Sequence, residues 1–131
     1  MPGFEIIGKD ERKAVNELFN DGGILFAHGF DGLRKNFHVR EFEELSKDTF
    51  KAKHSLAVSS GTAAIKIALK ALGVERGDEV ITQAFNFIAT IEAIVDIGAK
   101  PIIVNVNENL DIDLKHLESL INQKTKVLLP V

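Results

Sequence analysis

Two short segments of the chain contain residue types that could bind a phosphorylated, aromatic ligand. The first is Ser59-Ser60-Gly61-Thr62, which follows a short apolar run and precedes a helical pattern. The first N–H groups of a helix attract anions, Gly61 lets the backbone approach a ligand, and the hydroxyls of Ser60 and Thr62 can donate hydrogen bonds. A phosphate could bind here. Capping of the helix by Ser60 or Thr62 explains the same residues, and it is the commoner role of such a segment taken alone.

The second segment, Gln83-Ala84-Phe85-Asn86-Phe87, follows the next apolar run and places two aromatic residues beside polar ones. A planar heteroaromatic ring could stack on one of these phenylalanines. The simpler alternative is that both belong to the core. Phosphate donors and an aromatic surface are more suggestive together than separately, provided that the fold brings the two segments to the same place.

From residue 54 onward, short apolar runs alternate with helical patterns, which predicts a mostly parallel α/β sheet. Three of the runs are almost continuously apolar, as in strands that are covered on both faces. Since parallel strands end at one edge of their sheet, both segments should lie at that edge. The predicted strands are 55–58, 79–82, 101–104 and 127–130, and the predicted helices are 62–72, 87–97 and 114–121, with Asp113 as the cap of the last.

Before residue 54 the pattern predicts two amphipathic helices. The first begins with Asp10 as its cap and ends at Gly22-Gly23, and the second covers 39–50. An ordered loop, 24–37, joins them because no helical or strand period is present there. We therefore expect an N-terminal helical segment, 1–53, followed by an α/β part, 54–131.

The composition excludes several classes of protein. With 131 residues, 45% hydrophobic and 27% charged, the chain fits one globular domain or a piece of one. It has no apolar run near the roughly 20 residues of a membrane helix and no secretory signal at its start, so we expect a cytoplasmic protein without membrane contact. The absence of cysteine excludes disulfides. A net charge of −3 argues against nucleic acid as a partner.

Known motifs for other ligands are missing. The sequence has no glycine fingerprint for dinucleotides after its first strand, no P-loop and no hydrolase nucleophile elbow. Its four histidines are scattered singly, and the acidic stretch 105–113 lacks the glycine and glutamate of an EF-hand loop. We expect no metal site.

Taken in order and spacing, the sequence resembles the DegT/DnrJ/EryC1/StrS sugar aminotransferases, which are pyridoxal-phosphate-dependent enzymes of fold type I. The resemblance implies part of the large domain of that fold, preceded by N-terminal helices. It covers nearly the whole chain, which makes it more specific than any single motif. The matching segments are 54–64, 77–82, 85–90, 98–106 and 125–131.

The resemblance also implies roles for particular residues. Ser60, Gly61 and Thr62 would bind the phosphate of pyridoxal 5'-phosphate, and Phe87 would stack on its pyridine ring. Phe85 falls at a variable place of the family and is interpreted as core or substrate-side packing. The sequence departs from the family pattern at Gln83, where proline is usual, and we expect this change to alter the stiffness of the loop more than its chemistry.

Two residues that the family needs have no match in the chain. These are the aspartate that holds the pyridinium nitrogen and the lysine that carries the cofactor and moves the proton. The resemblance places both beyond residue 131, so no catalytic residue is assigned here and the isolated chain is expected to be inactive. The complete enzyme would transfer an amino group from glutamate or glutamine to a keto-sugar, as a homodimer.

Other readings remain open. The opening Pro2-Gly3-Phe4-Glu5 and the segment His28-Gly29-Phe30-Asp31 resemble a subgroup that includes the 8-amino-3,8-dideoxy-manno-octulosonate transaminase, so the keto-sugar could be nucleotide-linked or an octulosonate. The chain could also be a non-catalytic product of a truncated or split gene that binds phosphate or cofactor weakly or assembles with its other half. A free-standing nucleotide-binding domain is the remaining alternative.

Overall fold

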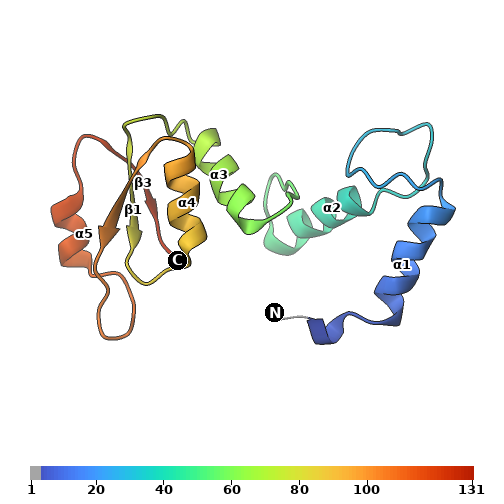
Figure 1. Cartoon of the computed structure of the whole chain (residues 1–131), viewed down its shortest axis with the longest axis horizontal. Helices are drawn as coiled ribbons and strands as arrows, with labels where there is room; N and C mark the ends of the chain where they lie inside the picture. Colours follow the sequence, from blue (N-terminus) through green and yellow to red (C-terminus); the bar gives the residue numbers. More distant parts are fainter. Residues whose placement is uncertain (1–3) are drawn as a thin grey trace. The chain divides into compact units, whose positions relative to one another are not determined.

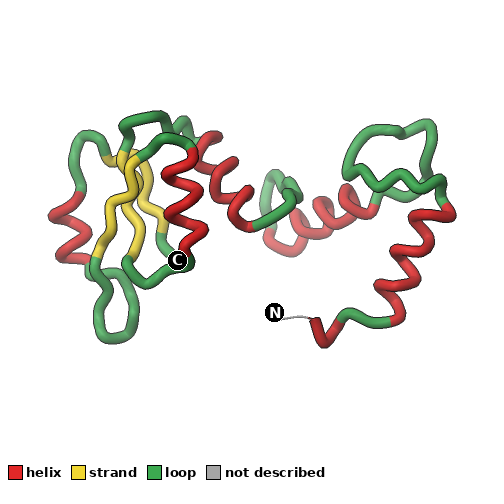
Figure 2. Tube along the Cα trace, viewed as in Figure 1, coloured by secondary structure: helices red, strands yellow, loops and turns green. Residues whose placement is uncertain are grey.

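The computed structural model describes residues 4–131, so Pro2 and Gly3 of the opening motif lie outside the described residues. The chain forms two compact units, Met1–Ala57 and Val58–Val131. Among the described residues, both units contain helices and the sheet lies in the second (Figures 1 and 2).

The first unit contains the short 3-10 helix η1 (Phe4–Ile6) and the helices α1 (Lys9–Asn20) and α2 (His38–Phe50). The prediction that Asp10 caps the first helix is wrong. Gly8 is the cap residue, and the Glu11 carboxylate accepts its N–H at 2.7 Å. The helix begins earlier than predicted because Glu11 satisfies this N–H, and Asp10 lies within the first turn.

The segment between α1 and α2 is an ordered loop, as predicted. Asp21 accepts the backbone N–H groups of Lys35 and Asn36, both at 3.1 Å. The buried guanidinium of Arg34 donates to the carbonyl of Ala27 at 3.1 Å. Side chains therefore supply the hydrogen bonds that a helix or strand would otherwise provide.

The second unit is a three-stranded parallel sheet in the order β2-β1-β3, with helices on both faces. Figure 1 shows α3 and α4 on one face and α5 on the other. The predicted parallel α/β architecture is thus confirmed. Its elements are α3 (Gly61–Ala71), β1 (Glu79–Gln83), α4 (Ile88–Asp96), β2 (Lys100–Val104), α5 (Leu114–Leu120) and β3 (Thr125–Leu129).

The predicted strand 55–58 is wrong, because these residues pair with no strand in the described part of the chain. The N–H of Ala57 donates instead to the buried carboxylate of Glu43 on α2, at 2.8 Å. Leu56 is 64% exposed. An apolar run becomes a strand only where a neighbour offers its backbone groups, and the described residues place no such neighbour beside this segment.

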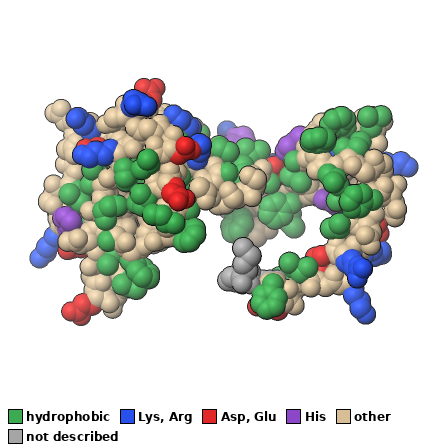
Figure 3. All heavy atoms as spheres, viewed as in Figure 1, with side chains coloured by type: hydrophobic (Ala, Val, Ile, Leu, Met, Phe, Trp, Pro, Cys, Tyr) green, Lys and Arg blue, Asp and Glu red, His purple; other side chains and the backbone are tan. Residues whose placement is uncertain are grey.

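The sequence predicts that the most apolar strands are covered on both faces, but in the structure the most buried strand is the less apolar β1. All five residues of β1 are buried, although three of them are polar. Ile103 of β2 and Leu128 of β3 are 43% and 47% exposed, because each of these strands lies at an edge of the sheet. Apolar side chains also reach the surface of both units in the view of Figure 3.

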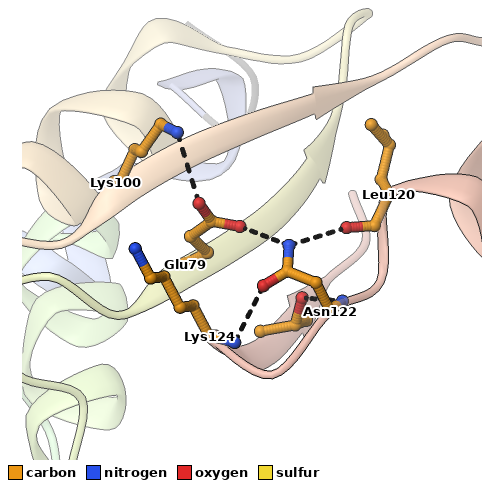
Figure 4. A network of polar contacts seen from close by, with 6 residues as sticks. Glu79, Lys100, Leu120, Asn122 and Lys124 are labelled. Atoms are coloured by element: carbon orange, nitrogen blue, oxygen red, sulfur yellow. Dashed lines mark hydrogen bonds and ion pairs between the residues drawn. The ribbon is translucent and has the colours of Figure 1, made fainter.

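A buried carboxylate aligns the beginnings of the three strands (Figure 4). Glu79, the first residue of β1, accepts a hydrogen bond from Asn122 at 2.8 Å and one from Lys100 at 3.2 Å. Asn122 precedes β3 and also accepts the N–H of Lys124 at 2.8 Å. The Asn122 amide and the Lys100 ammonium hold the pKa of Glu79 below its ordinary value of 4.5.

We predict that this carboxylate makes the fold sensitive to acid. A group whose pKa is lowered by folding stabilises the fold above its ordinary pKa, and this stabilisation is lost as the pH falls through the folded-state pKa. Between about pH 7 and about pH 3.5, Glu79→Gln should therefore lower the free energy of unfolding at the upper pH and flatten its decline. Urea unfolding at several pH values measures both effects. Glu92→Gln, at an exposed position on α4, should keep the wild-type profile, and an equally steep decline in Glu79→Gln would contradict the assignment.

Candidate cofactor site

The segment Ser59-Ser60-Gly61-Thr62 forms the start of α3. Ser60 is the cap residue in an extended conformation, and its Oγ accepts the N–H of Ala63 at 3.1 Å. The alternative that Ser60 caps the helix is therefore confirmed. The cap uses the hydroxyl oxygen as an acceptor and leaves its proton free to donate elsewhere.

Two backbone donors remain at this helix start. In the described part of the chain, the N–H groups of Gly61 and Thr62 meet no acceptor, as expected for the first residues of a helix. A Cβ built on Gly61 would have no atom within 4 Å. The turn is thus open on the side of its donors, and both N–H groups lie at the positive end of the helix dipole.

Phe87 is the residue immediately before α4 (Ile88–Asp96), and it is 75% exposed. Phe85 is 60% exposed. The alternative that both rings belong to the core is therefore wrong for this chain. The loop between them is held by Asn86, whose Nδ2 donates to Oγ1 of Thr82 at 2.9 Å. Both rings present apolar area from a loop that is anchored to β1.

The fold brings these two segments to the same side of the second unit. α3 and α4 run against the direction of the strands, so both helices begin where the strands end (Figure 1). An open hollow of about 470 Å³ lies beside Phe87, between the residues Gln83, Phe85, Asn86 and Val131. Residues 60–62 are not among those that line it. Residues 60–62 and the hollow beside Phe87 are therefore both at the end of the unit where the strands finish, but residues 60–62 lie outside the hollow.

Sequence reasoning missed a buried contact beside this hollow. Gln83, the last residue of β1, donates through Nε2 to the carbonyl of Phe85 at 3.2 Å. Its Oε1 accepts the N–H of Val131, also at 3.2 Å. The available signal was a long polar side chain at the end of a strand, where burial requires hydrogen-bond partners.

None of the ionisable groups with altered pKa values belongs to either segment. The backbone N–H of Gly8 lowers the pKa of Glu11, the N–H groups of Lys35 and Asn36 lower that of Asp21, and Arg40 lowers that of Asp31. These carboxylates stabilise local structure in the first unit. The described residues contain no group of three His, Asp or Glu side chains that could hold a metal ion. None of the described helices is long and apolar enough to cross a membrane.

The residues of the two segments fit a phosphate joined to an aromatic ring. Two free N–H groups and two hydroxyls match the acceptors of a phosphate dianion. An exposed phenylalanine gives a flat apolar surface against which a ring can stack. These are the kinds of group that such a molecule needs, and neither segment contains an acidic or basic side chain.

Known proteins with similar sequences match almost the whole chain. The chain is 39% identical over 127 residues to the spore coat polysaccharide biosynthesis protein SpsC of Bacillus subtilis, covering 96% of this chain and 30% of that protein. It is 32% identical to the GDP-perosamine synthase of Vibrio cholerae, covering 93% of this chain and 31% of that one. The chain therefore spans about 30% of the length of the relatives it matches.

Solved structures of aminotransferases have the same fold. The PLP form of Spr1654 from Streptococcus pneumoniae superposes with a TM-score of 0.83 at 28% identity, over 95% of this chain and 30% of that one. The aminotransferase from Psychrobacter cryohalolentis gives 0.80 at 29% identity, over 93% and 29%. The second unit thus represents part of the fold of pyridoxal-phosphate-dependent enzymes of fold type I.

The family of the chain follows from a match to a family model. The profile of the DegT/DnrJ/EryC1/StrS aminotransferase family matches residues 7–131, which is almost the whole chain. PLP and PMP forms among the similar solved structures identify pyridoxal phosphate as the cofactor of the group. The chain belongs to the DegT/DnrJ/EryC1/StrS aminotransferase family.

Proposed function

We propose that the protein containing this chain transfers an amino group from glutamate or glutamine to a keto-sugar. The family supports the reaction type, and the names of relatives support the substrate class. They include a GDP-perosamine synthase and a UDP-2-acetamido-2-deoxy-3-oxo-D-glucuronate aminotransferase, the latter 39% identical over 94 residues. Both names describe nucleotide-linked sugars, so we favour this type over an octulosonate.

Within this function we assign the chain to cofactor binding, with residues 54–131 as the cofactor-binding part of the large domain. The single observation that carries the assignment is the open helix start at Gly61 and Thr62, whose N–H groups have no acceptor among the described residues. These groups, with the hydroxyls of Ser60 and Thr62, would hold the cofactor phosphate. The exposed ring of Phe87 would lie against the pyridine and restrict its tilt.

Pyridoxal phosphate, when bound, supplies the electron sink that makes proton removal from the α-carbon of an amino acid possible. This chain's residues orient the group and leave the proton transfer to others. We propose that the lysine that carries the cofactor and the aspartate at the pyridinium nitrogen lie outside residues 1–131. We also propose that the complete protein is a cytoplasmic homodimer, for which the exposed apolar side chains of the first unit, such as Phe4 and Phe50, give support.

Thr62→Val should weaken phosphate binding specifically. Valine keeps the shape of threonine and removes the hydroxyl, and a hydrogen bond to a charged group contributes enough for a loss of affinity of about tenfold or more. Titration of the complete apoprotein with pyridoxal phosphate measures this loss. Pyridoxal, which lacks the phosphate, is the control ligand and should bind both proteins equally. Equal losses for the two ligands would contradict a phosphate contact at Thr62.

Phe87→Ala and Phe85→Ala form a matched pair, because both rings are exposed and belong to one loop. Stacking of a ring contributes about 0.5–1.5 kcal/mol, so Phe87→Ala should weaken pyridoxal phosphate binding about two- to twelvefold. Phe85→Ala should leave the affinity close to wild type. The readout is the dissociation constant from absorbance or fluorescence titration. A larger effect at Phe85 would transfer the stacking role to that ring.

The location of the cofactor lysine can be tested by chemical trapping. We expect that borohydride treatment of residues 1–131 with pyridoxal phosphate leaves no adduct on one specific lysine, whereas the complete protein gains a single adduct. Intact mass and peptide mapping provide the measurement. A stoichiometric adduct on one of the twelve lysines of this chain would overturn our proposal and show that these residues include the reactive lysine. A complete protein without any specific adduct would favour a non-catalytic product.

A further inference from the structure

Gln83 contacts the segments that follow all three strands of the sheet. It is the last residue of the central strand β1 and is 6% exposed. Nε2 donates to the carbonyl of Phe85 after β1 at 3.2 Å, and to that of Leu110 after β2 at 3.5 Å. Oε1 accepts the N–H of Val131 after β3 at 3.2 Å. One amide group thus connects three segments, of which the most distant lies 48 residues from Gln83 in the sequence.

The loop after β2 has a conformation that needs such support. Leu110 has a φ of +67°, a left-handed conformation that is unfavourable for a leucine. Asn107 shapes the turn, because its Oδ1 accepts the N–H groups of Asn109 at 2.9 Å and Asp111 at 3.0 Å. The carbonyl of the strained Leu110 is the one to which Gln83 donates.

Gln83 also lines two hollows at the ends of the strands. One, of about 470 Å³, is lined by Phe87, Phe85 and Asn86. The other, of about 480 Å³, is lined by the loop after β2, including Leu110 and Asp111. Gln83 and Val131 line both. The position of this one side chain therefore influences the shape of the surface on which Phe87 lies.

We propose that Gln83 is a positioning residue, whose amide joins the three loops and fixes residues 84–87 in the conformation that presents Phe87 to the cofactor. A side chain that only filled this place would be apolar, as Val80 and Ile81 are in the same strand. Gln83 instead uses its donor and its acceptor within the chain. That Gln83 helps to present Phe87 to the cofactor rests on the proposed function. That its amide joins the three loops rests on the hydrogen bonds alone.

The experiment compares Gln83→Leu with Gln123→Leu in the complete protein. Gln123 is exposed in the turn before β3, so the same substitution there controls for the chemical change. Hydrogen exchange of the apoprotein is measured first. Gln83→Leu should accelerate exchange in residues 84–87, 106–112 and at Val131, while the core of α4 keeps its wild-type rate. Unchanged exchange in all three segments would overturn the connection between the loops.

The second measurement is the affinity for pyridoxal phosphate in a double-mutant cycle. Loss of the two stronger hydrogen bonds should weaken binding about tenfold in Gln83→Leu, and not in Gln123→Leu. If Gln83 acts through Phe87, then Phe87→Ala should cost clearly less affinity in the Gln83→Leu background than in wild type. Full additivity, or wild-type affinity in a folded Gln83→Leu protein, would overturn the positioning role.

Failure of the proposed function gives a different pattern. A wild-type protein that binds no pyridoxal phosphate would refute the cofactor assignment and the positioning role together. The exchange measurement would still decide whether Gln83 joins the loops. Gln83→Glu separates these roles further, because it keeps the acceptor for the Val131 N–H and loses both donors. Exchange should then increase at 84–87 and 106–112 and remain slow at Val131, and equal acceleration everywhere would contradict the separate contacts.

Discussion

The second unit depends on the burial of polar groups at both ends of one strand. β1 lies between two parallel neighbours and is covered on both faces, so Glu79 at its start and Gln83 at its end must find partners within the protein. The partners of Glu79 are Lys100, the first residue of β2, and Asn122, which precedes β3. The partners of Gln83 lie in the segments that follow the strands. Hydrogen bonds from the side chains of β1 therefore reach residues at or before the start of its neighbours at one end and the segments that follow them at the other.

The two parts of the candidate site are positioned by the strands. The loop with Phe87 extends directly from the aligned end of β1, and the start of α3 lies on the same side because helix and strand directions alternate along the chain. Ser60 shows how a structural role and a binding role can coexist. Its oxygen caps the helix, while the N–H groups of Gly61 and Thr62 remain open to a ligand. A helix start without a capping side chain would have one more free donor and a less defined backbone.

The sequence predicts most helices and strands because each produces a hydrophobic period within its own segment, and their alternation along the chain indicates a parallel sheet. The helices, three of the four strands, the parallel sheet and the Asp113 cap agree with the structure. The predicted strand 55–58 does not form because its apolar run meets no partner strand among residues 4–131, and no local pattern records this. The sequence also does not predict which strand is most buried. β1 is fully buried although three of its residues are polar, because it is the central strand of the sheet. From the sequence, the proline-to-glutamine departure at Gln83 indicates only a change in loop stiffness, because the partners Leu110 and Val131 are distant in sequence.

The separation in sequence between β1 and its last partners has a consequence for biosynthesis. β1, α4 and β2 leave the ribosome as one continuous segment, whereas Asn122 and Val131 follow later. At typical rates of translation, the 27 residues from Val104 to Val131 take roughly 1–5 seconds to appear. During this interval the nascent βαβ segment has an unpaired backbone edge on β1, and its two terminal polar side chains have only part of their partners. The edge that is covered in the folded protein is therefore open to chaperones while the chain is being made.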